Sequence, residues 1–148
     1  MKQDYQLVFA QIVLIGLYIM EVQWIELSLP YWLRYLALID VAFGVIILLA
    51  GLLKLGNNLT PLPRPKRDGE LVTGGIFAYI RHPIYAGIIF IMAGGSLYFS
   101  STWKMLMATF IWLVFYYKSK LEESYLTEKF DDYESYKESS GRFFPKIK

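Results

Sequence analysis

The segment Arg81-His82-Pro83-Ile84-Tyr85-Ala86-Gly87 holds the residues of this chain best suited to chemistry. It lies where a charged loop rich in proline and glycine meets an apolar run, and a proline in that setting is typical of the first turn of a helix. Arg81 and His82 would then lie beside a helix N-terminus, where backbone amides and basic side chains suit a carboxylate or a phosphate. The structural alternative is that Pro83 only starts the helix and Arg81 reaches toward lipid headgroups.

A second group of chemical residues, Glu122 and Glu123, lies in register with the first. If the apolar runs before and after residues 100–103 form a helical hairpin centred near residue 101, His82 precedes that centre by as many residues as Lys120 follows it. Both arms rise by about 1.5 Å per residue, so the two glutamates return to the depth of His82. The sequence therefore predicts an anion-binding helix start facing a pair of acids.

Such a site suits a zwitterion that carries a carboxylate at one end and positive charge at the other. S-adenosylmethionine fits this description, because it has a carboxylate, an ammonium, a sulfonium and ribose hydroxyls that can donate to a glutamate. Tyr85 and Phe77 offer rings for adenine stacking or for contact with the sulfonium.

The elements that must position these residues are predicted to be membrane-spanning helices. The apolar fraction of 55%, the charged fraction of 19% and the mean hydropathy of +0.36 reflect long runs without charge. We expect an all-α, polytopic integral membrane protein that forms a single domain over 1–148. The predicted spans, of which the first is a retained span and not a cleaved signal peptide, are about 6–28, 35–55, 83–99 and 103–120.

The basic residues are distributed unevenly, which predicts an orientation. They crowd the loop over 56–82 and the segment over 121–148, whereas the other two connections hold only Arg34 and Lys104. By the positive-inside rule both termini, the middle loop and the chemical residues lie on the cytoplasmic face. Aromatic residues near helical spacing between acids after residue 120 predict an amphipathic surface helix that continues from the fourth span.

The composition also excludes several classes of site. The chain has no cysteine and one histidine, so disulfides, thiol catalysis and Cys- or His-based metal centres are not expected. No nucleic-acid partner is expected. Small residues in the second and third apolar runs favour close helix contact over chemistry. Glu21, Glu26 and Asp40 are acids near span ends and are candidates only by their position.

Several motifs, in this order, resemble the isoprenylcysteine carboxyl methyltransferase and phospholipid methyltransferase superfamily. They are Glu70-Leu71-Val72-Thr73, the Arg81 to Gly87 segment, Lys118-Ser119-Lys120-Leu121-Glu122-Glu123, Phe130…Tyr133…Tyr136 and Arg142…Pro145. The resemblance covers roughly residues 59–145, and the helix-start motif together with the acid pair is its most specific part. It implies an integral membrane enzyme that binds S-adenosylmethionine on its cytosolic side and takes a lipophilic substrate from the bilayer.

Carried over position by position, the resemblance implies cofactor contacts from the backbones of Leu71 and Val72 and from Phe77, His82, Pro83, Tyr85 and Glu122, with Arg81 added by the helix-start argument. The family commonly has an arginine that acts on the substrate carboxylate four residues before the glutamate. Lys118 stands there in this chain, which keeps the charge but loses the bidentate fork. Phe77, Ile76 and Asp131 stand where tyrosine, proline and glycine are frequent in the family.

The function expected is S-adenosylmethionine-dependent methyl transfer to a lipophilic acceptor in the membrane, a lipid or a lipidated substrate. An isoprenylcysteine-like carboxylate needs only a cation, Lys118 or Arg142, to hold it. A phospholipid-like amine needs a base to remove its proton, for which Glu122 and Glu123 are the candidates. The alternatives are a membrane reductase that uses a nicotinamide cofactor and a non-catalytic scaffold that binds membrane lipids.

Overall fold

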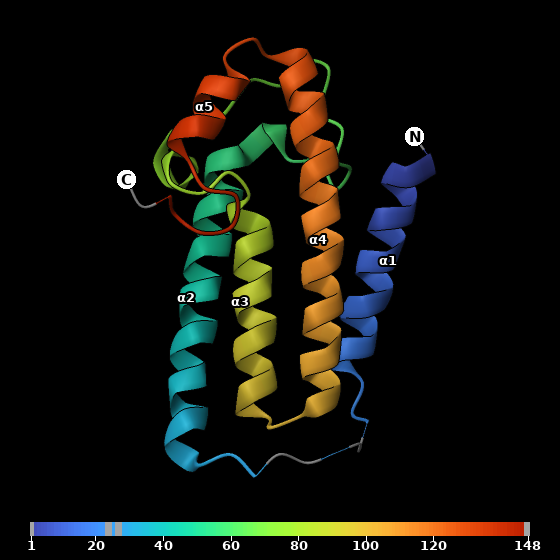
Figure 1. Ribbon diagram of the computed structural model, residues 1–148, viewed down its shortest axis with the longest axis vertical. Helices are drawn as coiled ribbons and strands as arrows, with labels where there is room; N and C mark the ends of the chain where they lie inside the picture. The colour runs from blue at the N-terminus through green and yellow to red at the C-terminus, as the bar shows by residue number, and fades with distance from the viewer. Residues whose placement is uncertain (1, 23–24, 26–27, 147–148) are drawn as a thin grey trace.

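The computed structural model describes residues 2–22, 25 and 28–146 as an all-α arrangement without a strand in those residues. Four long helices lie side by side, and the fifth, short helix covers one end of them (Figure 1). In chain order the elements are α1 (Lys2–Ile19), α2 (Tyr31–Leu55), η1 (Gly56–Asn58), η2 (Gly75–Ala78), α3 (Pro83–Tyr98), α4 (Thr102–Lys129) and α5 (Tyr133–Ser139), where η denotes a 3-10 helix.

The tightest packing in the bundle is between α2 and α3, and glycines make it possible. A Cβ atom on Gly44 would lie 2.8 Å from the carbonyl oxygen of Gly87, and one on Gly87 would lie 2.7 Å from that of Gly44. A Cβ atom on Gly94 would lie 2.7 Å from the carbonyl oxygen of Ala37. The two backbones are therefore in direct contact, which confirms the prediction that small residues mark close helix contact.

α3 and α4 form the predicted hairpin, and α1 packs on the far side of α4 (Figure 1). The connection between the hairpin helices runs over residues 99–101, close to the expected turn at 100–103. The hydroxyl of Ser101 accepts a hydrogen bond from the backbone of Lys104 and so caps the start of α4. This hairpin fixes the depth at which α4 meets the start of α3.

Among the described residues one helix is long and apolar enough to cross a membrane, the 28 residues of α2 with η1 over Tyr31–Asn58, in which an 18-residue window has a mean hydropathy of 2.7. α3, with 16 residues, is apolar but shorter. The outer faces of α1 and α2 expose large apolar side chains, among them Phe9, Trp32 and Leu53. Such a surface is typical of contact with lipid or with a partner.

The first predicted span, 6–28, is wrong in its limits, because α1 ends at Ile19. The last carbonyls of α1 are taken by side chains from the start of α4. Trp103 Nε1 donates to the carbonyl of Leu17 at 2.9 Å, and Lys104 Nζ donates to that of Tyr18 at 2.8 Å. The helix therefore ends against α4 and does not continue toward Pro30. Glu26 lies outside the described residues.

The amphipathic helix predicted after the fourth span is two helices. α4 continues to Lys129, where the backbone of Phe130 becomes extended, and Asp131 and Asp132 form a turn. α5 follows and folds over the end of the bundle (Figure 1). It is tied back to α4 where Glu134 accepts from Thr127 at 3.1 Å, and within α5 Glu134 also accepts from Lys137 at 3.1 Å. The two aspartates therefore redirect a chain that the spacing of aromatic residues predicted to be straight.

Candidate active site

The start of α3 is held in place by the C-terminal segment. Pro83 is the first residue of the helix and His82 precedes it, as predicted. The backbone N–H of Arg81 donates to the carbonyl of Gly141 at 2.8 Å, and that of His82 donates to the carbonyl of Arg142 at 3.1 Å. A side chain on Gly141 would collide with the carbonyl of Phe144, so the tight path of the C-terminal segment after this residue needs glycine. The backbone ahead of α3 is thereby fixed before any side chain is considered.

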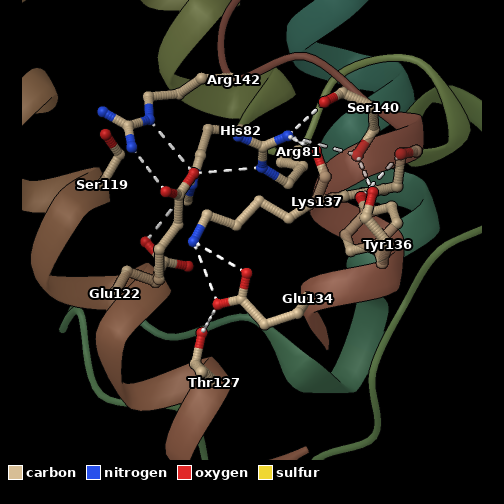
Figure 2. A network of polar contacts seen from close by, with 12 residues as sticks. Arg81, His82, Ser119, Glu122, Thr127, Glu134, Tyr136, Lys137, Ser140 and Arg142 are labelled. Carbon is tan, nitrogen blue, oxygen red and sulfur yellow. Dashed lines mark hydrogen bonds and ion pairs between the residues drawn. The ribbon is translucent and has the colours of Figure 1, made fainter. Parts of the chain in front are cut away.

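Three basic side chains, those of Arg81, His82 and Arg142 (Figure 2), converge on the buried carboxylate of Glu123. Arg81 Nε donates to Glu123 Oε1 at 3.1 Å. Arg142 donates to both oxygens, from Nε at 3.1 Å and from NH2 at 2.6 Å. His82 Nε2 lies 3.3 Å from Oε1. Burial alone would raise the pKa of Glu123, but the hydrogen bonds from His82 and Arg142 and the charge of Arg81 lower it well below its ordinary value.

Arg81 also fastens α5 and the segment that follows it. Its guanidinium donates to the carbonyl of Lys137 at 3.0 Å and to that of Ser140 (Figure 2). The hydroxyl of Ser140 donates to the carbonyl of Tyr136 at 2.7 Å, and the hydroxyl of Tyr136 donates to the carbonyl of Phe77 at 2.7 Å. We call these residues the Glu123 cluster: Glu123, Arg81, His82 and Arg142. The cluster joins α4, the start of α3, the end of α5 and the C-terminal segment.

Glu122 has a different environment from its neighbour. Its side chain is 28% exposed, against 5% for that of Glu123. The hydroxyl of Tyr85 donates to Glu122 Oε2 at 2.7 Å, and His82 Nδ1 lies 3.7 Å from the same oxygen. The Tyr85 ring is stacked with His82 at a centroid distance of 5.4 Å and with Phe115 at 4.7 Å. The ring of Tyr85 is therefore already in contact with protein groups, and its hydroxyl orients Glu122.

Lys118 lies one helical turn before Glu122 on α4 and is 2% exposed. Its ammonium donates to Gln11 Oε1 of α1 at 2.7 Å and lies 5.2 Å from the centroid of the Tyr85 ring. A lysine ammonium has three N–H donors, of which the contact with Gln11 uses one. The lysine is therefore a buried cation that α1 holds in place.

Two adjoining cavities meet at this point. The larger cavity, of about 240 Å³, is lined by Gln11, Leu55, Leu59, Thr60, Pro61, Phe77, Arg81, His82, Pro83, Ile84, Tyr85, Ile88, Lys118 and Glu122. The smaller cavity, of about 90 Å³, is lined by Leu55, Asn58, Thr60, Pro65, Lys66, Gly69, Glu70, Leu71, Val72, Phe77, Arg81, Glu122, Leu126, Phe130, Tyr133 and Tyr136. Glu122, Arg81 and Phe77 are among the residues that line both.

The structure brings most of the predicted site residues together. His82, Pro83, Tyr85 and Lys118 line the larger cavity, and Leu71 and Val72 line the smaller one. Glu123 and Arg142, predicted as catalytic, line neither cavity, and they bind each other. For Glu123 the physical reason is helical geometry, since successive residues of a helix point about 100° apart and Glu122 is the one that lines the cavities.

Sequence reasoning missed Gln11, Thr60 and Tyr133. Gln11 carried a usable signal, because it is an amide within the apolar run over 7–20. Thr60 carried none, and Tyr133 belonged to the Phe130…Tyr133…Tyr136 motif without a role of its own, since the place of both in the cavity lining depends on the path of the loop and of α5. Glu21 and Asp40 line neither cavity.

Chemically, the arrangement offers a carboxylate between two compartments of different character. The larger cavity combines aliphatic side chains with the buried cation of Lys118. The smaller cavity combines the loop over 65–72 with aromatic residues from the end of α4 and from α5. No group of three or more His, Cys, Asp or Glu in the described part of the chain is placed to hold a metal ion.

Comparison with known proteins gives three consistent findings. The profile of the family named phospholipid methyltransferase matches residues 32–133. The protein-S-isoprenylcysteine O-methyltransferase of Schizosaccharomyces pombe is 31% identical over 113 residues, which are 72% of this chain and 47% of that protein. The enzyme of the same name from Homo sapiens is 28% identical over 129 residues, 84% of this chain and 45% of that protein. The chain thus spans about half the length of the curated relatives it matches.

The fold is also that of a solved structure. The eukaryotic intramembrane Ras methyltransferase ICMT (isoprenylcysteine carboxyl methyltransferase) superposes with a TM-score of 0.71 at 24% identity. The match covers 97% of this chain and 53% of that chain. At this identity the comparison establishes the arrangement of the helices.

Proposed function

The chain belongs to the phospholipid methyltransferase family, whose methyltransferases use S-adenosylmethionine, and we propose that it transfers the methyl group of this cofactor to a carboxylate on a lipophilic acceptor. The observation that carries the proposal is the pair of adjoining cavities with Glu122 in the wall of both. Such a pair suits two ligands that must meet, one polar and one lipophilic.

The residues around the smaller cavity fit the cofactor. Glu122 is oriented by Tyr85 and keeps an exposed fraction of 28%, so it is available to accept from an ammonium or from ribose hydroxyls. Leu71 and Val72 offer backbone from the loop, and Phe77 offers an apolar wall. The buried hydroxyl of Tyr133 has no hydrogen-bond partner among the described residues, and buried polar groups normally have one.

The residues around the larger cavity fit an acceptor with an apolar body and an anionic end. Leu55, Ile84 and Ile88 supply apolar surface, and Lys118 supplies a buried cation. With one N–H of Lys118 on Gln11, two donors are left for the acceptor carboxylate. Arg142, the other cation considered from the sequence, is engaged by Glu123 through two hydrogen bonds. Lys118 is therefore the group we assign to the carboxylate.

The cofactor supplies a methyl group on a sulfonium, and transfer forms a bond from a carboxylate oxygen to the methyl carbon as the carbon–sulfur bond breaks, leaving an ester and a neutral thioether. The residues of this chain have three tasks in that reaction. Lys118 orients the carboxylate, the aliphatic wall excludes water, and Glu122 holds the other ligand. No protein base is required, because a carboxylate acceptor has no proton to lose.

We further propose that the chain is integral to the membrane and that both cavities open near its cytoplasmic face. The length and apolar character of α2 and the exposed apolar faces of α1 and α2 support insertion. The basic residues of the loop over 56–82 and of the segment after Tyr117 support the orientation.

The proposal is tested by measuring methyl transfer from labelled S-adenosylmethionine in nanodiscs, with an N-acetylated S-farnesylcysteine, its carboxamide and phosphatidylethanolamine as acceptors. We expect transfer to the carboxylate alone. Lys118→Met should lower kcat/KM for this acceptor by about 10- to 100-fold, because a hydrogen-bonded charge is lost. Lys120→Met is the matched control, since Lys120 is exposed on the same helix.

Three results would contradict the proposal. Transfer to phosphatidylethanolamine would move the acceptor to an amine and make Glu122 a base. Binding of a reduced nicotinamide dinucleotide in place of S-adenosylhomocysteine would favour a reductase. Binding of neither by folded protein in nanodiscs would favour a lipid-binding scaffold.

A further inference from the structure

Tyr133 is the first residue of α5 and one of the most completely buried large side chains of the molecule, with 1% of its surface exposed. It lines the smaller cavity together with Tyr136, and the two rings meet edge to face at a centroid distance of 5.8 Å. The two tyrosines thus belong to one helix and line one cavity, but their hydroxyl groups differ in their hydrogen bonding.

The hydroxyl of Tyr136 donates to the carbonyl of Phe77 at 2.7 Å. The hydroxyl of Tyr133, buried from solvent, has no hydrogen-bond partner among the described residues. A buried polar group without a partner is unfavourable and uncommon in folded proteins. The other two buried side-chain atoms without a partner in the described part of the chain are Arg34 Nε and Ser100 Oγ, and neither residue lines a cavity described above. Tyr133 is therefore the one residue of the three that lines a cavity of the site.

The surroundings of Tyr133 keep its hydroxyl protonated. Burial is the main cause of a pKa raised well above the ordinary value for tyrosine, and the negative charge of Glu123 adds to it. Arg81 opposes this effect and is outweighed. At physiological pH the group is consequently an O–H donor, and it would bind an acceptor atom.

We propose that Tyr133 is a further cofactor-binding residue, whose hydroxyl donates a hydrogen bond to an acceptor atom of S-adenosylmethionine in the smaller cavity. This inference rests on the proposed function, because it takes the smaller cavity to be the cofactor site. The inference goes beyond the proposed function because it gives α5 a direct part in binding the cofactor, in addition to its packing against the bundle.

The test compares Tyr133→Phe with wild type in two measurements on the whole chain in nanodiscs. The first is the Kd of S-adenosylhomocysteine by calorimetry, and the second is the thermal unfolding midpoint without ligand. We expect the affinity to fall about tenfold, because one hydrogen bond is lost. The midpoint should stay the same or rise, because the substitution removes a buried polar group that has no partner.

Tyr136→Phe is the matched control, and its unfolding midpoint without ligand should change in the opposite direction. It breaks the hydrogen bond to Phe77, so its midpoint without ligand should fall. A purely structural role for Tyr133 would give the same pattern in Tyr133→Phe.

An unchanged Kd in Tyr133→Phe would overturn the inference, because the hydroxyl would then be satisfied without the cofactor. A lower midpoint or a failure to fold would also overturn it, since the hydroxyl would then support the fold. If wild type itself fails to bind S-adenosylhomocysteine, the proposed function fails and this inference fails with it. That result is distinct from a Tyr133→Phe variant that binds as wild type does.

Discussion

Glu122 and Glu123 are adjacent in the chain, but they belong to two regions of the molecule with different tasks. Glu122 lines both cavities and is held by one tyrosine hydroxyl. Glu123 lines neither and is surrounded by Arg81, His82 and Arg142. The comparison shows that one turn of α4 can line the ligand cavities on one face and hold the surrounding segments together on the next. Two adjacent residues of the same type therefore need not act in the same function.

The largest effect we predict is the loss of stability in Glu123→Ala. Removing this carboxylate leaves Arg81 buried without its counter-ion and frees Arg142, so the free energy of unfolding should fall by about 3–5 kcal/mol. Chemical or thermal unfolding in detergent measures it. Glu134→Ala, which removes only exposed contacts, the pair with Lys137 and the hydrogen bond from Thr127, is the control and should leave the midpoint nearly unchanged. Equal midpoints for the two variants would show that the Glu123 cluster does not hold the fold.

The two regions also differ in how far sequence reasoning reached. The start of α3 at Pro83 and the hairpin that returns Glu122 to His82 followed from local rules, because proline position and helical rise depend little on the rest of the chain. The pairing of Gly141 and Arg142 with the backbone ahead of α3 did not, since it joins segments far apart in the chain. The end of α1 at Ile19 and the turn at Asp131 and Asp132 were missed for a similar reason, because packing and turn formation overrode the apolar pattern.

A smaller effect, confined to the cavity region, is expected for Tyr85→Phe. The ring keeps its stacking with His82 and Phe115, and only the hydrogen bond to Glu122 is lost. The affinity for S-adenosylhomocysteine should fall about tenfold while the unfolding midpoint changes little. A large drop in the midpoint with unchanged affinity would place Tyr85 with the Glu123 cluster and blur the distinction between the regions.

The smallest effect that we predict near neutral pH is the pH dependence of the free energy of unfolding. The folded-state pKa of Glu123 lies below its unfolded-state value, so the carboxylate stabilises the fold fully above the unfolded-state pKa, and this stabilisation is lost as the pH falls. Wild-type stability should therefore be steady near neutral pH and decline below about pH 4.5. Glu123→Gln should be less stable at pH 7 and show a weaker decline. An identical decline in both proteins would assign the acid sensitivity to another group.

The separation of tasks between the two glutamates is tested most directly by Glu122→Gln and Glu123→Gln measured in parallel. Both receive the same two assays, the Kd of S-adenosylhomocysteine and the unfolding midpoint without ligand. We predict that Glu122→Gln loses at least tenfold in affinity at an almost unchanged midpoint. Glu123→Gln should lose stability first, with any loss of affinity following from it. Wild-type affinity in Glu122→Gln, or an equal loss of stability in both variants, would contradict the account.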